Sequence, residues 1–107
     1  MKKEVNKEYT NTLEVTVAIE EPIFYQVIMH NDDFTPMEFV VAILERFFFM
    51  DRLKAVEIMM EVHTLGRAIC GIFSKDVAES KVADITEYSR MHEHPLFCSV
   101  ESGNEEG

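Results

Sequence analysis

Apolar residues recur along this chain with two different periods, and the period predicts which segments are strands and which are helices. An apolar residue at every second position indicates a strand, and a spacing of three or four indicates an amphipathic helix. The predicted strands cover residues 23–30, 67–74 and 96–101, and the predicted helices cover 36–50, 52–65 and 75–92. This order predicts an α+β domain in two layers, with three helices packed on a three-stranded sheet.

The first predicted strand carries apolar side chains on both of its faces. Val27 and Met29 lie on one face and Ile28 on the other. A strand that is apolar on both faces is typical of the middle of a sheet, where both faces are covered. We therefore expect strand 23–30 to lie between the other two.

Capping residues mark where the first helix begins. Thr35, Pro36 and Glu38 have the spacing of a capping box with proline at the first helical position. Phe34 and Phe39 are spaced as a hydrophobic staple around this start. At its other end the helix closes with three phenylalanines and a methionine, residues 47–50. This run is apolar all round, so we expect that end to be buried on most sides.

The second helix has a recognisable residue at each end, and a predicted strand follows it. Asp51 is suited to the N-cap of helix 52–65, and Gly66 to the left-handed position that follows it. In strand 67–74, strict alternation places Ala68, Cys70 and Ile72 on one face.

The first 22 residues differ in character from the rest of the chain. Leu13, Val15, Val17 and Ile19 alternate with polar or small residues, but no turn residues nearby would pair this segment locally. We expect an extended N-terminal arm over residues 1–22, a compact domain over 23–101 and a disordered tail over 102–107.

The balance of charge excludes two classes of partner. The chain has 20 acidic and 10 basic side chains, a net charge of −10. Nucleic acids and anionic membranes bind through phosphate neutralisation, which this balance opposes. No apolar stretch reaches the ~20 residues of a membrane span, and the first dozen residues lack the apolar centre of a signal peptide. Cys70 and Cys98 lie in separate apolar runs and indicate buried thiols in a reducing compartment. We expect a cytoplasmic protein.

Residues 30–33, His-Asn-Asp-Asp, together with His63, are the polar groups best suited to chemistry. Adjacent carboxylates at a turn tend to diverge rather than share a proton, and no nucleophile with a matching base accompanies them. No glycine-rich phosphate loop is present, and the histidines and carboxylates lack the spacing of zinc or calcium motifs. We expect neither catalysis nor a functional metal site, and no cofactor.

The same groups are better suited to binding a cation. Asn31, Asp32 and Asp33 supply oxygen acceptors at the head of the first helix, and His63 can accept a hydrogen bond when it is neutral. Carbonyls at the end of the second helix add partial negative charge. Flexible methionines nearby suit a pocket for a large apolar side chain. Taken singly, each feature is more often an ordinary turn or core; their combination favours a ligand with an ammonium group beside an apolar side chain.

Residues 31–40, Asn-Asp-Asp-Phe-Thr-Pro-Met-Glu-Phe-Val, resemble the ClpS adaptor family. The similarity continues through residues 62–63, 66–71, 78–82 and 94–96 and covers the chain from about 23 to 101. It implies a fold similar to the C-terminal domain of the ribosomal stalk protein and a role as an adaptor rather than an enzyme. It further implies binding of N-degron substrates with a free N-terminal Leu, Phe, Tyr or Trp, and their delivery to the ClpA unfoldase of the ClpAP protease.

The resemblance also assigns residues to three sites. The substrate α-amino group would be bound by Asn31, Asp33 and His63, with Asp32 adding negative charge. The side-chain pocket would be lined by Met29, Thr35, Pro36, Met37, Val40, Met50, Met59, Val62 and Leu96. Within it, Met37 matches the gatekeeper position, where bulk excludes the β-branched residues Val and Ile. The N-terminal domain of ClpA would contact Asp76, Glu79 and Lys81, and the arm would correspond to the extension used in substrate transfer.

One alternative from a different class stays open at this point. The chain could be an interaction module that docks on the unfoldase and modulates its choice of substrates without a substrate pocket of its own.

Overall fold

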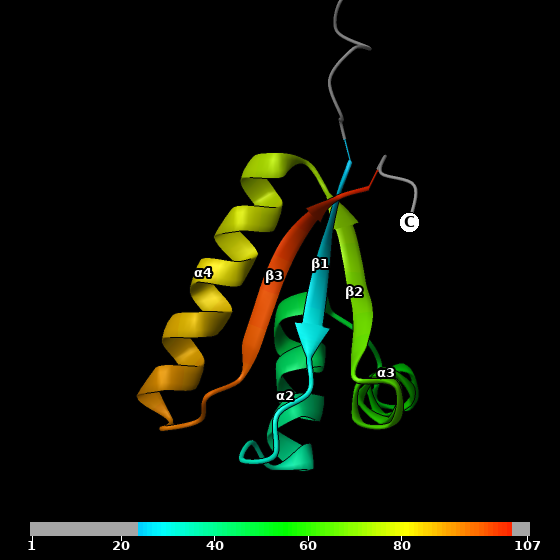
Figure 1. Cartoon of the computed structure of the whole chain (residues 1–107), viewed down its shortest axis with the longest axis vertical. Coiled ribbons are helices and arrows are strands. Elements are labelled where there is room, and N and C mark those ends of the chain that lie inside the picture. The colour runs from blue at the N-terminus through cyan, green and yellow to red at the C-terminus, as the bar shows by residue number, and fades with distance from the viewer. Residues whose placement is uncertain (1–23, 104–107) are drawn as a thin grey trace, which may run out of the picture.

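The computed structural model describes residues 24–103, and its elements follow the predicted order (Figure 1). The elements are β1 (Tyr25–His30), α2 (Met37–Phe48), α3 (Arg52–Leu65), β2 (Arg67–Phe73), α4 (Lys75–Met91) and β3 (Phe97–Ser102). Every bound lies within two residues of its prediction. The predicted arm, residues 1–22, lies outside the described residues, as do residues 104–107 of the predicted tail. Ser102 and Gly103 do not belong to a tail, because the strand includes the first and the second donates its N–H to the Phe24 carbonyl at 2.7 Å.

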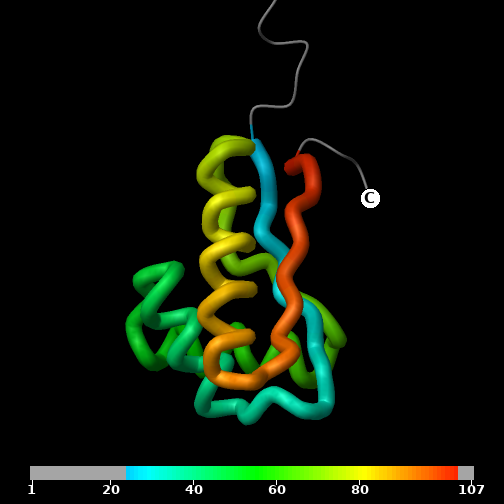
Figure 2. The backbone as a smooth tube through the Cα atoms, turned by 90° about the vertical axis from the view of Figure 1, so that its left-hand side faces the viewer, coloured from blue at the N-terminus to red at the C-terminus, as the bar shows by residue number. Residues whose placement is uncertain are grey.

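The three strands form one antiparallel sheet in the order β2-β1-β3. β1 is therefore the central strand, as its two apolar faces predict. All three helices lie on one face of this sheet, which makes the two layers visible from the side (Figures 1 and 2). The predicted fold class, three helices on a three-stranded sheet, is confirmed. Within the described residues no helix is both long and apolar enough to cross a membrane.

The prediction that Ile72 shares a face with Ala68 and Cys70 is wrong, because β2 contains a bulge. Val27 of β1 pairs with Gly71 and Ile28 pairs with Ile69, so Cys70 is an extra residue with no partner of its own. An extra residue reverses the alternation beyond it. Ala68 and Cys70 are consequently buried against the helices, whereas Ile72 is 57% exposed on the open face of the sheet.

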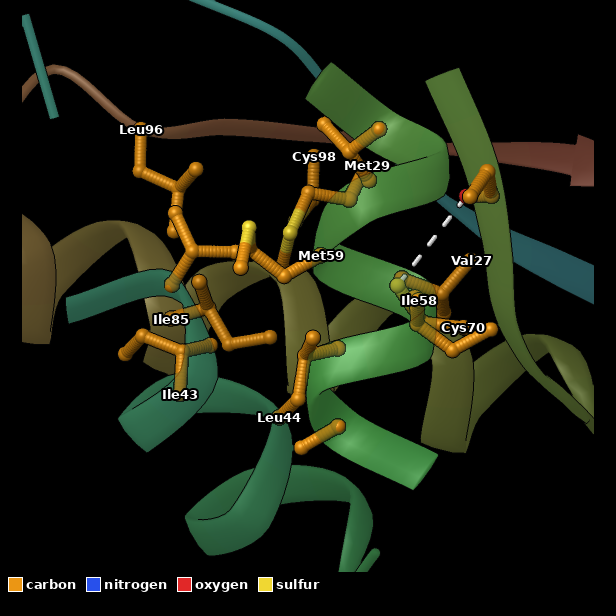
Figure 3. Packing of buried hydrophobic residues seen from close by; sticks show 14 of the residues in the cluster. Val27, Met29, Ile43, Leu44, Ile58, Met59, Cys70, Ile85, Leu96 and Cys98 are labelled. Atoms are coloured by element: carbon orange, nitrogen blue, oxygen red, sulfur yellow. Dashed lines mark hydrogen bonds between the residues drawn. The ribbon is translucent and has the colours of Figure 1, made fainter. Parts of the chain in front are cut away.

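The core lies between the sheet and the helices and takes residues from every element (Figure 3). Val27 and Met29 of β1, Ile43 and Leu44 of α2 and Ile85 of α4 are all fully buried. Both cysteines belong to this cluster. Burial raises the pKa of the Cys70 thiol, and likewise that of Cys98, to about 12. At neutral pH both therefore stay protonated and act as small apolar side chains rather than as nucleophiles.

The start of α2 differs from the predicted capping box. The N-cap residue is Pro36 and no side chain accepts a hydrogen bond from the first turn. The Thr35 hydroxyl instead donates to Asp32 at 2.8 Å, and the Glu38 carboxylate accepts from Arg52 of α3 at 2.9 Å. The predicted staple is also wrong, because the Phe34 side chain is 81% exposed. Thr35 and Glu38 therefore do not cap α2, because each is hydrogen-bonded to a charged side chain instead.

The end of α2 also departs from its prediction. The helix stops at Phe48, and Phe49 adopts the left-handed conformation with φ of 56°, its N–H donating to the Leu44 carbonyl. The Phe49 side chain is 83% exposed. The expectation of a helix end buried on most sides is therefore wrong for this residue, while Phe47 and Phe48 do pack against the core.

Both predicted caps of α3 are present. The Asp51 carboxylate accepts a hydrogen bond from the Lys54 N–H at 2.8 Å, which satisfies one of the free donors of the first turn. Gly66, with φ of 92°, occupies the left-handed position after the helix and donates to the Val62 carbonyl. Glycine adopts this conformation without the steric penalty of a Cβ.

The cap at Asp51 gives a first prediction about stability. Replacing Asp51 with Ala removes the acceptor for the Lys54 N–H and should lower the free energy of unfolding by about 1 kcal/mol. For a domain of this size that corresponds to a fall in Tm of about 4–8 °C. Asp51→Asn keeps an oxygen acceptor and serves as the control, with a smaller loss in thermal unfolding followed by circular dichroism. Equal Tm values for Asp51→Ala and the unchanged protein would show that the cap contributes nothing.

Candidate binding site for a cationic chain end

The turn between β1 and α2 is organised by the carboxylate of Asp32. One carboxylate oxygen accepts the backbone N–H groups of Phe34 and Thr35 at 2.8 and 2.9 Å, and the other accepts the Thr35 hydroxyl. A short acidic side chain that binds its own following backbone is a common way to stabilise a turn. The Asp32 side chain therefore faces the backbone of the turn and is half-buried, whereas its neighbour Asp33 is exposed.

A backbone hydrogen bond joins this turn to the end of α3. The Asn31 N–H donates to the Gly66 carbonyl at 3.0 Å, immediately after the sheet pair His30–Arg67. Because Gly66 reverses the chain after α3, the last turn of that helix lies against the β1–α2 turn. His63 is on that last turn. Asn31 and His63, 32 residues apart in the sequence, are thus brought to one site.

A cavity of about 150 Å³ lies where these segments meet. It is lined by His30, Asn31, Asp32, Asp33, Thr35, Met37, Val40, Met59, Val62, His63 and Leu96. The lining contains two carboxylates and neither lysine nor arginine. Within residues 24–103 the side chains of Asn31, Asp33 and His63 form no hydrogen bond, so their polar atoms are available to a ligand.

The inner wall of the cavity is part of the hydrophobic core. Val40 of α2, Met59 and Val62 of α3 and Leu96 before β3 are all less than a tenth exposed, and Figure 3 shows Met59 and Leu96 among the packed side chains. Met37, which is 45% exposed, stands in the first turn of α2. A cavity of about 150 Å³ is large enough for a benzene molecule, and therefore for a phenyl or leucyl side chain.

Three residues that the resemblance assigns to the pocket do not line it. Met29 is fully buried in the core, on the face of β1 that the helices cover. Met50 packs against the core from the loop after α2, about 18 Å along that helix from Met37. Pro36 is exposed and forms the N-cap of α2. All other residues assigned to the amino group and the side-chain pocket border the one cavity.

His30 also borders the cavity, although the resemblance does not assign it to the pocket. Its ring nitrogen Nε2 is hydrogen-bonded to the Ser99 hydroxyl at 2.8 Å, and the ring lies 5.1 Å from that of Phe97. The ring is thus held on β3, on the open face of the sheet. In the sequence, the one indication that His30 lies near the site is its position directly before Asn31, at the end of the predicted strand.

The cavity lacks the donor set of a metal centre. Across residues 24–103, no three His, Cys, Asp or Glu side chains are grouped so that they could hold a metal ion. What the site presents is a mouth of hydrogen-bond acceptors and negative charge over an apolar floor. Such an arrangement is chemically suited to a cation that carries an apolar group.

The residues assigned to partner contact lie elsewhere. Asp76, Glu79 and Lys81 are on the first two turns of α4, at the end of the sheet opposite to the β1–α2 turn (Figure 1). Asp76 and Glu79 are exposed and Lys81 is half-buried. A partner bound to this part of α4 would leave the cavity accessible.

Comparison with known proteins identifies the family. A sequence model described as "ATP-dependent Clp protease adaptor protein ClpS" matches residues 20–99. The chain belongs to the ClpS family. It is 54% identical over 83 residues to the ClpS adapter of Vibrio atlanticus, covering 78% of each chain. It is 49% identical over 87 residues to that of Alkalilimnicola ehrlichii, covering 81% of this chain and 82% of the relative.

A solved structure of the family agrees with the fold described above. ClpS2 of Agrobacterium tumefaciens, bound to L-phenylalaninamide, superposes with a TM-score of 0.73 at 33% identity. The match covers 76% of this chain and 98% of ClpS2. The protein is thus an adaptor of the Clp protease by family, and one member of that family binds an amino-acid amide.

The organisation of the turn gives a second prediction. Asp32→Ala removes the acceptor for three donors and should lower the free energy of unfolding by about 1–2 kcal/mol. Hydrogen bonds to a charged group contribute about 1.5–3 kcal/mol each when buried, and less in a partly exposed turn such as this one. Asp32→Asn retains one oxygen acceptor and should lose less. Urea denaturation measures both. If Asp32→Ala unfolds at the same urea concentration as the unchanged protein, Asp32 does not stabilise the turn.

Proposed function

We propose that this ClpS-family adaptor binds the N-terminal residue of N-degron substrates that begin with Leu, Phe, Tyr or Trp. It delivers them to the ClpA unfoldase of the ClpAP protease. The observation that carries the proposal is the cavity between the β1–α2 turn and α3, because its polar mouth and apolar floor match the two halves of a chain's first residue.

The mouth suits a protonated α-amino group. In the proposal Asn31, Asp33 and His63 accept its three N–H groups, and Asp32 adds negative charge from within the turn. The C-terminal end of α3, where His63 lies, adds the partial negative charge of its carbonyls. Because the lining contains neither lysine nor arginine, no permanent positive charge at the mouth repels an ammonium group.

The floor suits an apolar side chain of limited size. Val40, Met59, Val62 and Leu96 present apolar atoms to a volume that matches a phenyl ring. The ligand of the related ClpS2 is L-phenylalaninamide, which combines an α-amino group with such a ring and lacks a carboxylate. That chemistry is what the first residue of a polypeptide offers, and it supports the proposal.

The expected affinity is moderate. Hydrogen bonds to a charged group contribute about 1.5–3 kcal/mol each, and burying a Leu or Phe side chain contributes about 1.5–3 kcal/mol. Association itself costs roughly 4–15 kcal/mol. The surplus is sufficient for capture and small enough for release, as an adaptor requires.

Delivery requires a second surface for the unfoldase. We place it on the first two turns of α4, at Asp76, Glu79 and Lys81, away from the cavity. The protein then acts in the cytoplasm by holding substrate and partner together, without a chemical step of its own. The cavity favours this role over that of a module that docks on the unfoldase without a substrate pocket.

The third prediction tests the amino-group site. A peptide that begins with Phe should bind, and its N-acetylated form, which has lost the positive charge, should bind at least a hundredfold more weakly. Fluorescence anisotropy of labelled peptides gives both dissociation constants. Asn31→Ala and His63→Ala should each weaken binding of the free form at least tenfold, the loss of about one hydrogen bond to a charged group. Equal affinity for the free and acetylated peptides would exclude α-amino recognition.

The fourth prediction concerns selectivity at the mouth of the cavity. Met37 is partly exposed on the first turn of α2 and borders the cavity. Met37→Ala should open this wall and raise the affinity for peptides that begin with Val or Ile at least fivefold, with little change for Leu. Met60→Ala is the matched control, because Met60 is similarly exposed, at 42%, and does not border the cavity. Unchanged selectivity in Met37→Ala would remove Met37 as the gatekeeper.

A further inference from the structure

The ammonium group of Lys81 lies over three aromatic rings. Its nitrogen is 5.2 Å from the ring centre of Phe49, 5.4 Å from that of Phe73 and 5.9 Å from that of Phe48. All three distances lie within the range of a cation–π interaction. Although the chain carries 20 acidic residues, Lys81 forms no ion pair with any residue of the 24–103 region. Aromatic rings, rather than a carboxylate, hold this positive charge in place.

Phe49 is an unusual residue for the position it occupies. Its φ of 56° is left-handed, a conformation that costs a bulky residue energy and that glycine adopts freely after a helix. The ring gains little burial in return, because the residue is 83% exposed. A strained backbone that displays an apolar ring to solvent points to a role outside the stability of the domain.

The other two rings of the cluster are built into the fold. The Phe48 and Phe73 rings lie 6.2 Å apart and tilted, at the junction of α2 and β2. A Cβ on Gly71 would lie 2.6 Å from the Phe73 ring, which is too close for either atom. The glycine therefore leaves room for this ring. Lys81 is thus positioned by segments from α2, β2 and α4 together.

We propose that Phe49 is an apolar anchor of the unfoldase-binding surface, next to Lys81, which the proposed function already assigns to that surface. The exposed Phe49 ring lies directly beside an ammonium group that forms no ion pair within residues 24–103. A partner surface complementary to this pair would combine an apolar pocket with a carboxylate at its edge. The inference rests on the proposed function, because it extends the surface at Asp76, Glu79 and Lys81 from α4 to the end of α2.

The anchor and the substrate cavity are separated by the length of one helix. Met37 borders the cavity at the start of α2, and Phe49 follows its end, about 18 Å away for a helix of 12 residues. Figure 1 shows the start of α2 beside the β1–α2 turn and its end toward the first turns of α4. Changes at Phe49 should therefore leave the cavity as it is.

Phe49→Gly tests the anchor without disturbing the fold. Glycine relieves the left-handed backbone, so we expect a Tm equal to or above that of the unchanged protein, together with an unfoldase affinity at least tenfold lower. The affinity for L-phenylalaninamide should stay within twofold. Lys81→Met, which keeps an apolar stem and removes the charge, should also lower the unfoldase affinity at least tenfold. Isothermal titration of the full chain against intact ClpA and against the amide supplies these values.

Met91→Ala is the matched control, since Met91 is 71% exposed at the other end of α4, and it should bind ClpA as the unchanged protein does. The inference alone fails if the unchanged protein binds ClpA and Phe49→Gly binds it equally well. It also fails if the unchanged chain self-associates through this surface, seen as a dimer in light scattering that Phe49→Gly abolishes. If the unchanged protein does not bind ClpA at all, the partner assigned under the proposed function is what fails.

Discussion

The hydrogen bond from the Asn31 N–H to the Gly66 carbonyl determines where the site forms. It ties the loop that follows the central strand to the point at which α3 ends. It extends the pairing of β1 and β2 by one step beyond His30–Arg67, and so keeps the acceptors of the β1–α2 turn beside the last turn of α3, which carries His63. Gly66 makes the bond possible, because its left-handed conformation closes α3 and turns its own carbonyl toward the neighbouring strand connection.

Around this junction the protein divides its polar groups between structure and binding. Asp32 uses both carboxylate oxygens to hold the turn, which leaves Asn31, Asp33 and His63 to a ligand. Thr35 likewise has a structural role in the turn, because its hydroxyl donates a hydrogen bond to Asp32 instead of capping α2. The floor of the cavity consists of buried core residues, so the packing that stabilises the domain also shapes the pocket.

The sequence predicts those features that depend on local chemistry. The caps of α3 at Asp51 and Gly66, the central position of β1 and the three-helix layer all follow from single residues or periodicity. The exceptions required tertiary information. The Glu38 carboxylate pairs with Arg52 of another helix instead of completing the predicted capping box. The bulge at Cys70 places Ile72 on the opposite face of the sheet from the one predicted. Phe49 was expected to be buried because its neighbours are, and nothing in the local pattern distinguishes its backbone from theirs. For the cavity, Met29 and Met50 look like pocket residues in sequence, and only their depth and distance along α2 separate them from it.

In the proposed function, the junction of the β1–α2 turn and α3 binds a positively charged α-amino group. The most direct test is the affinity for L-phenylalaninamide measured by isothermal titration between pH 7 and pH 9.5. An α-amino group loses its charge with a pKa of about 8, so the dissociation constant should rise about tenfold for each pH unit above that value. A dissociation constant that stays constant across this range would contradict recognition of the charged amino group.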